Sequence, residues 1–171
     1  LGAAASATEP VELRVKQGQY LVAAKIAATV SQPLVIRGGY SGEAGDAITG
    51  VSAFDANFAN LTGILGVTAK GGLTLENCQF LNCQFVDSNT VTNSAQSLIY
   101  SGYADSLLVK NCNFCGGTVG VDVSGPASDD RSTNNTVQFN DFANQVNTAI
   151  RVVNQIHVLV DSNYCNDVLT N

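Results

Sequence analysis

An alternation of apolar and variable positions, closed by a polar turn, occurs twice near the middle of this chain. Residues 73–80 read Leu-Thr-Leu-Glu-Asn-Cys-Gln-Phe, and residues 107–114 read Leu-Leu-Val-Lys-Asn-Cys-Asn-Phe. An apolar residue at every second position is typical of a strand with one buried face. The Asn that follows favours a turn, and the Cys and Phe after it favour burial. The pattern therefore predicts two copies of one strand-and-turn unit.

Looser copies of this unit follow at residues 137–142 and 160–165, and a second repeated strand occurs before the unit. The second strand is found at residues 98–102, 121–125 and 150–154. Recurrence at intervals of roughly 20–50 residues is typical of repeat proteins in which successive units stack. No long stretch has helical periodicity, so we expect like strands to pair in parallel, about 4.8 Å apart.

The sequence thus predicts an all-β protein, a single-stranded right-handed parallel β-helix (β-solenoid) of about five to seven coils. Residues 1–10 are interpreted as an N-terminal extension or cap, and residues 11–171 as the parallel β-helix domain. We expect residues 43–60 to form a loop or a laterally extended coil, and residues 87–96 to form a loop. Further strands are predicted at residues 11–15, 21–26, 33–37 and 61–69.

Stacking of like strands makes specific predictions about the core and about the turns. One buried column should contain Leu75, Val109, Val137 and Val160. A second buried column should contain Leu98, Val121 and Ile150. At the turn, side-chain amides should stack as a ladder formed by Asn77, Asn111, Asn140 and Asn163.

The composition agrees with a folded protein made of strands and turns. The 171 residues are enough for one domain with a sizeable core. Apolar residues make up 45% of the chain, and charged residues only 13%, about half the usual share. Much of the polar character comes instead from Asn, Gln, Ser and Thr, together with 16 Gly, which argues against long helices.

The net charge of the chain argues against two classes of partner. The formal net charge is −6 and no cluster of Lys and Arg exists, so nucleic acid and anionic membranes are not expected partners. No apolar run reaches the roughly 18 residues of a transmembrane helix. The first seven residues resemble the end of a processed secretory segment or an Ala-rich cap.

The chain contains five cysteines, and an odd number cannot all pair in disulfides within one chain. Cys78, Cys112 and Cys165 recur at turn positions, which favours small buried residues stacked between coils. One disulfide, Cys112–Cys115 or Cys78–Cys83, is the first alternative. The Cys-x-x-Cys spacing also suggests a metal pair, but a zinc site needs further ligands and the chain has one His.

Two early segments resemble a known family. Residues 13–20 (Leu-Arg-Val-Lys-Gln-Gly-Gln-Tyr) and 34–42 (Leu-Val-Ile-Arg-Gly-Gly-Tyr-Ser-Gly) are similar to the first coils of bacterial right-handed parallel β-helix repeat proteins. These belong to the pectin-lyase-like superfamily, and the resemblance is to its adhesin or surface-protein type. It covers about residues 11–167. The superfamily spans lyases, hydrolases, adhesins and fibre proteins, so the resemblance implies a fold and leaves the activity open.

Polysaccharide lyases of this superfamily carry a calcium-binding carboxylate cluster beside an Arg or Lys base. In this chain Asp122 and Arg151 fall at the same register of neighbouring coils, and both are expected to point outward. Such a pair is able to bind an acidic sugar. The favoured interpretation is a surface ion pair, worth under about 1 kcal/mol.

The other candidate groups are weaker. Asp129 and Asp130 resemble the paired carboxylates of polygalacturonase-type hydrolases, but the Asn-Thr-Asp, Gly-His-Gly and Arg-Ile-Lys motifs of those enzymes are missing. Asp and Ser are also ordinary turn formers. His157 is expected to be an exposed surface residue. Four tyrosines either form a platform for sugar rings or simply pack against neighbouring side chains: Tyr40, Tyr100, Tyr103 and Tyr164.

We expect a non-enzymatic module, secreted or at the cell surface, with an adhesive or structural role in a larger protein or assembly. The alternatives are a carbohydrate-active enzyme of the pectate-lyase-like class acting on acidic polysaccharide, and a self-assembling fibre subunit. No cofactor is expected, except calcium if the lyase alternative holds. The expected partners are a carbohydrate or other surface ligand. End-to-end contact with further coils, another domain or another subunit is also expected, because no charge cluster or Pro protects the strand edge after residues 158–164.

Overall fold

The computed structural model describes most of the chain, and this part is all-β. The described residues are 6–24, 26–43, 45–56, 64–69, 72–83, 97–102, 106–125 and 132–166. They contain 19 strands and no helix. Within these ranges, accordingly, no helix is long and apolar enough to cross a membrane. The loop predicted at residues 87–96 lies outside the described residues.

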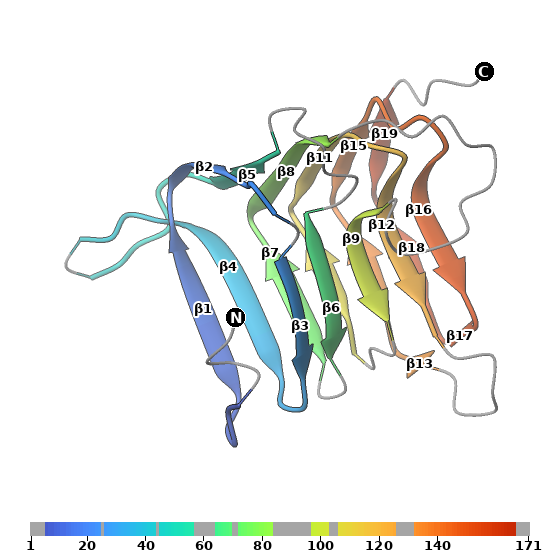
Figure 1. The fold of residues 1–171 in the computed structure, drawn as a ribbon, viewed down its shortest axis with the longest axis horizontal. Helices are drawn as coiled ribbons and strands as arrows, with labels where there is room; N and C mark the ends of the chain where they lie inside the picture. The colour runs from blue at the N-terminus through green and yellow to red at the C-terminus, as the bar shows by residue number, and fades with distance from the viewer. Residues whose placement is uncertain are drawn as a thin grey trace.

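Three parallel sheets contain nearly all of the strands (Figure 1). Sheet A consists of β1 (Val11–Lys16), β4 (Leu34–Tyr40), β7 (Leu73–Glu76), β10 (Leu108–Lys110), β14 (Thr136–Gln138) and β18 (Leu159–Asp161). Sheet B consists of β2 (Gly18–Leu21), β5 (Ser52–Asp55), β8 (Cys78–Cys83), β11 (Asn113–Gly116), β15 (Asp141–Ala143) and β19 (Tyr164–Asn166). Sheet C consists of β3 (Ile26–Val30), β6 (Leu65–Ala69), β9 (Ser97–Gly102), β12 (Val119–Ser124) and β16 (Thr148–Val153). A short parallel pair is formed by β13 (Ser132–Thr133) and β17 (Gln155–Ile156).

The chain visits the sheets in rotation, from A to B to C and back to A. One such passage is called a circuit here, and the six strands of sheet A mark six circuits. Each strand pairs in parallel with the strand that occupies the same place in the next circuit. In Figure 1, β1 lies at one end of the molecule and β16, β18 and β19 lie at the other. Each circuit therefore has three main strands, one more than the two that the repeats had revealed.

The register of the first predicted column is confirmed, and three of its four members are buried. Val109 aligns with Leu75 on one side and with Val137 on the other, and Val137 aligns with Val160. The first three side chains of this column, from Leu75 to Val137, are fully buried. Val160 is 48% exposed because its strand, β18, is the last of sheet A.

The second predicted column is correct except for Leu98. Val121 aligns with Ile150, but its partner on the other side is Ile99. Both Leu98 and Ile99 are fully buried. Alternation alone could not choose between two adjacent apolar residues that both enter the core, and the predicted register was wrong by one position.

A continuous stack of aromatic rings runs along the inside of sheet B. Its ring centroids are 4.8–5.7 Å apart and adjacent rings are inclined by 10–26°. The stack consists of Tyr20, Phe54, Phe80, Phe114 and Phe142. Two predictions are corrected here. Phe54 lies on β5, a regular strand of sheet B, inside residues 43–60, which were expected to form a loop or a laterally extended coil. Cys165 aligns with Phe142, not with the cysteines at the turns.

The corner from sheet A to sheet B has a repeated backbone conformation. From β7 onward, each strand of sheet A is followed by one residue with positive φ: Asn77, Asn111, Phe139 and Ser162, with φ of 52–55°. Asn accepts this left-handed conformation readily, whereas a bulky side chain does so at a cost. The two Asn residues at this corner therefore have a local backbone role.

The residue after each of these positions points inward and bonds the backbone. Asn140 Nδ2 donates to the carbonyl oxygen of Val109 at 3.0 Å and to Asn163 Oδ1 at 3.0 Å. Asn163 Nδ2 donates to the carbonyl oxygen of Val137 at 2.8 Å. The predicted amide ladder thus exists between Asn140 and Asn163 only. The full column at this corner is Gly18, Ser52, Cys78, Cys112, Asn140 and Asn163.

Asn77 has a different partner from the one predicted. Its Nδ2 donates to the carbonyl oxygens of Gly38 at 3.0 Å and Gly50 at 2.8 Å. The Asn77 side chain can come this close to the backbone only because residue 39, with φ of 85°, is Gly. A Cβ at residue 39 would collide with the Asn77 amide and with the Gly50 carbonyl. Asn111 is exposed and is not part of an amide ladder.

Connections at the corner from sheet B to sheet C differ greatly in length while the sheets continue unchanged. β8 ends at Cys83 and β9 begins at Ser97, whereas β11 ends at Gly116 and β12 begins at Val119. In both circuits the strands on either side keep their parallel partners. The register is therefore independent of the number of residues in this connection.

Phe139 is expected to lower stability at its present position, because a bulky residue in the left-handed conformation costs roughly 1–2 kcal/mol. Phe139→Asn should raise the free energy of unfolding by about 1 kcal/mol, since Phe139 is 52% exposed and little burial is lost. The measurement is urea denaturation. The reverse change at the equivalent position, Asn111→Phe, should lower stability by a similar amount. A lower stability for Phe139→Asn would contradict the explanation.

Candidate functional site

Asp122 and Arg151 lie on adjacent strands of sheet C, as the register predicted. Arg151 aligns with Asp122, and its Nη1 donates to Asp122 Oδ2 at 2.9 Å. The Ser124 hydroxyl donates to Asp122 Oδ1 at 2.5 Å, and Arg151 Nη1 also donates to Ser124 Oγ at 3.3 Å. Tyr100 aligns with Asp122 on the other side. The ion pair favoured by the sequence is therefore present.

The expectation that both groups are exposed is wrong for Asp122. Its side chain is fully buried, whereas that of Arg151 is 30% exposed. A buried carboxylate requires compensation, and here a guanidinium and a hydroxyl supply it. Both oxygens of the carboxylate are already bonded, so the arrangement fixes the charge in place and resembles a structural pair more than an open general base.

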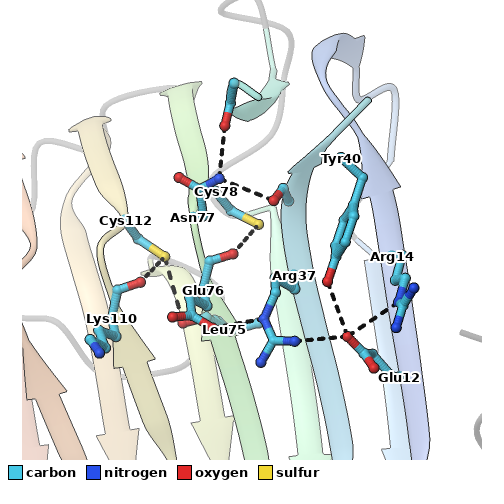
Figure 2. A network of polar contacts seen from close by, with 12 residues as sticks. Glu12, Arg14, Arg37, Tyr40, Leu75, Glu76, Asn77, Cys78, Lys110 and Cys112 are labelled. Atoms are coloured by element: carbon cyan, nitrogen blue, oxygen red, sulfur yellow. Dashed lines mark hydrogen bonds and ion pairs between the residues drawn. The ribbon is translucent and has the colours of Figure 1, made fainter. Parts of the chain in front are cut away.

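A second charged network lies on β1, β4 and β7, the first three strands of sheet A (Figure 2). Arg37 bridges two carboxylates: its Nε lies 2.8 Å from Glu76 Oε2 and its Nη1 lies 2.9 Å from Glu12 Oε1. The Tyr40 hydroxyl donates to the same Glu12 oxygen at 3.3 Å. Hydrogen bonding with Tyr40 and Glu76 raises the pKa of the Arg37 guanidinium, although burial opposes this. The network joins the first three circuits.

Arg14 completes this network at its edge. It lies 3.5 Å from Glu12 and 3.4 Å from Asp46, and its guanidinium stands over the Tyr40 ring at 5.2 Å from the centroid. Sequence analysis missed the network. The sequence alone carried no clear signal, because Arg14, Arg37 and Glu76 share one register position only once the pairing of β1, β4 and β7 is known.

The prediction that cysteines at the turns are buried and stacked is confirmed for Cys78 and Cys112, which are buried at the same corner (Figure 2). Each thiol donates to a backbone carbonyl oxygen, Cys78 to Glu76 at 3.4 Å and Cys112 to Lys110 at 3.2 Å. Burial raises the pKa of both thiols to about 12.

The disulfide alternatives are wrong. Cys78, Cys112 and Cys115 are free thiols, which removes both proposed pairs, and the exposed Cys165 is also free. Within the part of the chain that the structure describes, no group of three or more His, Cys, Asp or Glu side chains is placed to hold a metal ion.

A cavity of about 120 Å³ lies within the first circuits. Its lining consists of Leu13, Val15, Ile26, Ile36, Phe54, Ile64, Leu65 and Phe80. All of these side chains are hydrocarbon, so the lining contributed by the described residues provides no group for acid–base or nucleophilic chemistry. It contrasts with an enzyme pocket, where a few polar groups converge among apolar ones.

The remaining candidates that the structure describes are His157, Tyr40 and Tyr164, and they lie on or beside different elements. His157 is exposed, as expected, and has positive φ at the corner before β18. Tyr40 is buried and belongs to the sheet A network, whereas Tyr164 is 63% exposed on β19. Asp129 and Asp130, like Tyr103, lie outside the described residues.

Comparisons with known proteins do not identify a family. A scan against protein-family models, a search among curated proteins and a search among solved structures each found no match.

Replacement of Arg151 should be much more damaging than replacement of an exposed Arg. Arg151→Met leaves the buried Asp122 carboxylate without its guanidinium, and it should lower the free energy of unfolding by about 3–5 kcal/mol. Arg14→Met, which removes a half-exposed partner of Glu12, should have a far smaller effect. Urea denaturation measures both. Adding Asp122→Asn to Arg151→Met should recover part of the loss, and no recovery would contradict this role of the carboxylate.

The thiols should react in the order of their exposure. At pH 8 iodoacetamide should label Cys165 in the folded protein, whereas Cys78 and Cys112 should be labelled only after unfolding. Attack requires the thiolate, and a pKa of about 12 leaves almost none of it at Cys78 and Cys112. Peptide mapping by mass spectrometry identifies the labelled positions. Labelling of Cys112 as fast as Cys165 would contradict its buried position.

Proposed function

We propose that this chain is a right-handed parallel β-helix of six coils, in which each circuit of the chain is one coil. The rotation through sheets A, B and C supports this, as does parallel pairing between like strands of neighbouring circuits. Right-handed crossovers are the strong preference for parallel strands in one sheet. The aromatic stack inside sheet B is the kind of inner column that such a fold forms.

We propose further that the β-helix has an adhesive or structural role and no catalytic one. The observation that carries this is the way its charged side chains are used. Arg37 is held between Glu12 and Glu76, and the Asp122 carboxylate is bonded by Arg151 and Ser124. These groups connect neighbouring circuits, and none of the pairs lines the cavity. Such pairs between circuits stabilise an elongated scaffold.

We also propose a cellular location for this protein. A secreted or cell-surface module of a larger protein or assembly agrees with the resemblance of residues 13–20 and 34–42 to bacterial surface β-helix proteins. The low content of charged residues, 13% of the chain, is compatible with contact with a carbohydrate or another surface ligand.

The proposal is tested with acidic polysaccharides. Unsaturated sugar products absorb ultraviolet light, so lyase activity is followed as a rise in absorbance with and without calcium. We expect no rise on polygalacturonate, alginate or a glycosaminoglycan. Glycan binding, measured by calorimetry on the same panel, should be the same for wild type and for Asp122→Asn. A calcium-dependent rise that Asp122→Asn abolishes would overturn the non-enzymatic role and establish the lyase alternative.

A further inference from the structure

Phe139 is unusual among the residues that turn the chain from sheet A to sheet B. From β7 onward the equivalent positions are Asn77, Asn111 and Ser162, and all four residues have φ of 52–55°. Asn accepts this left-handed conformation readily, whereas a bulky side chain is strained in it. Because small polar residues make the same turn in the other circuits, the turn does not require Phe. Strain of this kind is characteristic of functional positions, so Phe139 needs an explanation beyond the fold.

Burial does not compensate for this strain. The phenylalanine rings of the aromatic stack lie inside sheet B, but Phe139 is 52% exposed. Its exposure belongs to the corner and not to an open edge of a sheet, because a described circuit lies on each side of it. The pairing of β14 with β10 and β18 places Asn111 beside it on one side and Ser162 on the other. Neither core packing nor the turn therefore explains an aromatic ring at this position.

Polar side chains surround the exposed ring. Asn111 and Ser162 flank it along the corner, and the Phe139 amide donates to the backbone carbonyl oxygen of Asp161 at 3.3 Å. Asp141 follows two residues later and faces outward, because its neighbours in the chain on both sides are buried. All four of these polar residues are exposed. An apolar ring is thus bordered by amide, hydroxyl and carboxylate groups.

A sugar in its pyranose form matches such a surface. One face of its ring presents C–H groups, which pack on an aromatic ring, and the hydroxyls around its edge both donate and accept hydrogen bonds. Carboxylates accept from these hydroxyls, and the amide of Asn111 donates as well as accepts. Among the described residues of this corner, Asp141 and Asp161 carry two negative charges and Lys110 carries one positive charge. This balance disfavours an acidic sugar and favours a neutral one.

We infer that Phe139 is the platform on which a neutral sugar stacks, and that the four polar residues around it bind the sugar's hydroxyls. The inference rests on the proposed adhesive role, and it identifies the chemical class of the ligand and a place for it at a corner of the β-helix. It also accounts for a strained residue, because residues that serve binding commonly lower stability. One stacked ring and a few hydrogen bonds leave little free energy after the cost of association, so we expect a millimolar dissociation constant.

Titration with methyl β-D-galactopyranoside and methyl β-D-glucopyranoside, followed by NMR on isotope-labelled protein, tests the site. We expect at least one of the two to cause saturable shifts of the backbone amide signals of Asn111, Phe139 and Ser162. Galacturonate, which has the galactose ring but carries a carboxylate, should bind at least about threefold more weakly than that methyl glycoside. An absence of saturable shifts at these three residues with both methyl glycosides, or tighter binding of galacturonate, would overturn the inference.

Phe139→Asn separates binding from folding, since it should raise the free energy of unfolding while it removes the platform. Binding of the same methyl glycoside should weaken about tenfold, whereas Phe139→Tyr keeps a ring and should stay within about threefold of wild type. The matched control is Ile48→Asn, which removes an apolar side chain of the same 52% exposure from the loop between β4 and β5. It should leave binding unchanged. Undiminished binding by Phe139→Asn, or an equal loss with Ile48→Asn, would overturn the site.

Failure of this inference is distinguishable from failure of the proposed role. Lyase activity on an acidic polysaccharide would overturn the proposed role whatever the methyl glycosides do. An absence of lyase activity, together with an absence of glycoside binding at Phe139, would overturn the sugar site alone and leave the structural role in place.

Discussion

Parallel backbone pairing between successive circuits is the constraint on which the rest of this structure depends. Each strand follows the one before it in a fixed register, so every side chain lies directly against its counterpart in the next circuit. Leu75, Val109 and Val137 form a fully buried row for this reason. The same register stacks the Phe rings inside sheet B and sets Arg37 between two carboxylates outside sheet A. The same repeat thus determines the positions of both the buried and the exposed side chains.

From β7 onward, the corner from sheet A to sheet B divides two tasks between adjacent residues, which helps to keep this register. One residue turns the chain with positive φ, and the next bonds backbone groups of the preceding circuit. Asn77 and Asn111 perform the first task, and Asn140 and Asn163 perform the second. Cys78 and Cys112 occupy the second position too, where their thiols donate to carbonyl oxygens. A buried backbone carbonyl that lacked such a donor would be destabilising, so the inward position accepts several residue types that share a donor.

The sequence was sufficient for the strand class, the stacking of like strands and the column through Leu75, because clear alternation and repeated turn residues specify them. It was insufficient where two neighbouring positions had similar chemistry. Leu98 and Ile99 are both apolar and both buried, and the four Asn residues of one corner occupy two different positions. The pairing of Asp122 with Arg151 followed from the register, but the burial of Asp122 did not, because covering a side chain depends on segments far away in the sequence. The sheet A network was missed since the strands that share it, β1, β4 and β7, are not recognisable copies of one another.

The unequal connections between sheets B and C have a practical consequence. Closing a longer loop costs only a little more conformational entropy, about 0.6 kcal/mol for each doubling of its length. The tight connection between Gly116 and Val119 joins the same two sheets as the long one that begins after Cys83. A foreign peptide grafted into the long connection after Cys83 would therefore be carried at a known height along the stack, between β8 and β9. Grafts placed two circuits apart at this corner would lie about 10 Å from each other, twice the strand separation, so the chain would serve as a ruler for presenting short peptides.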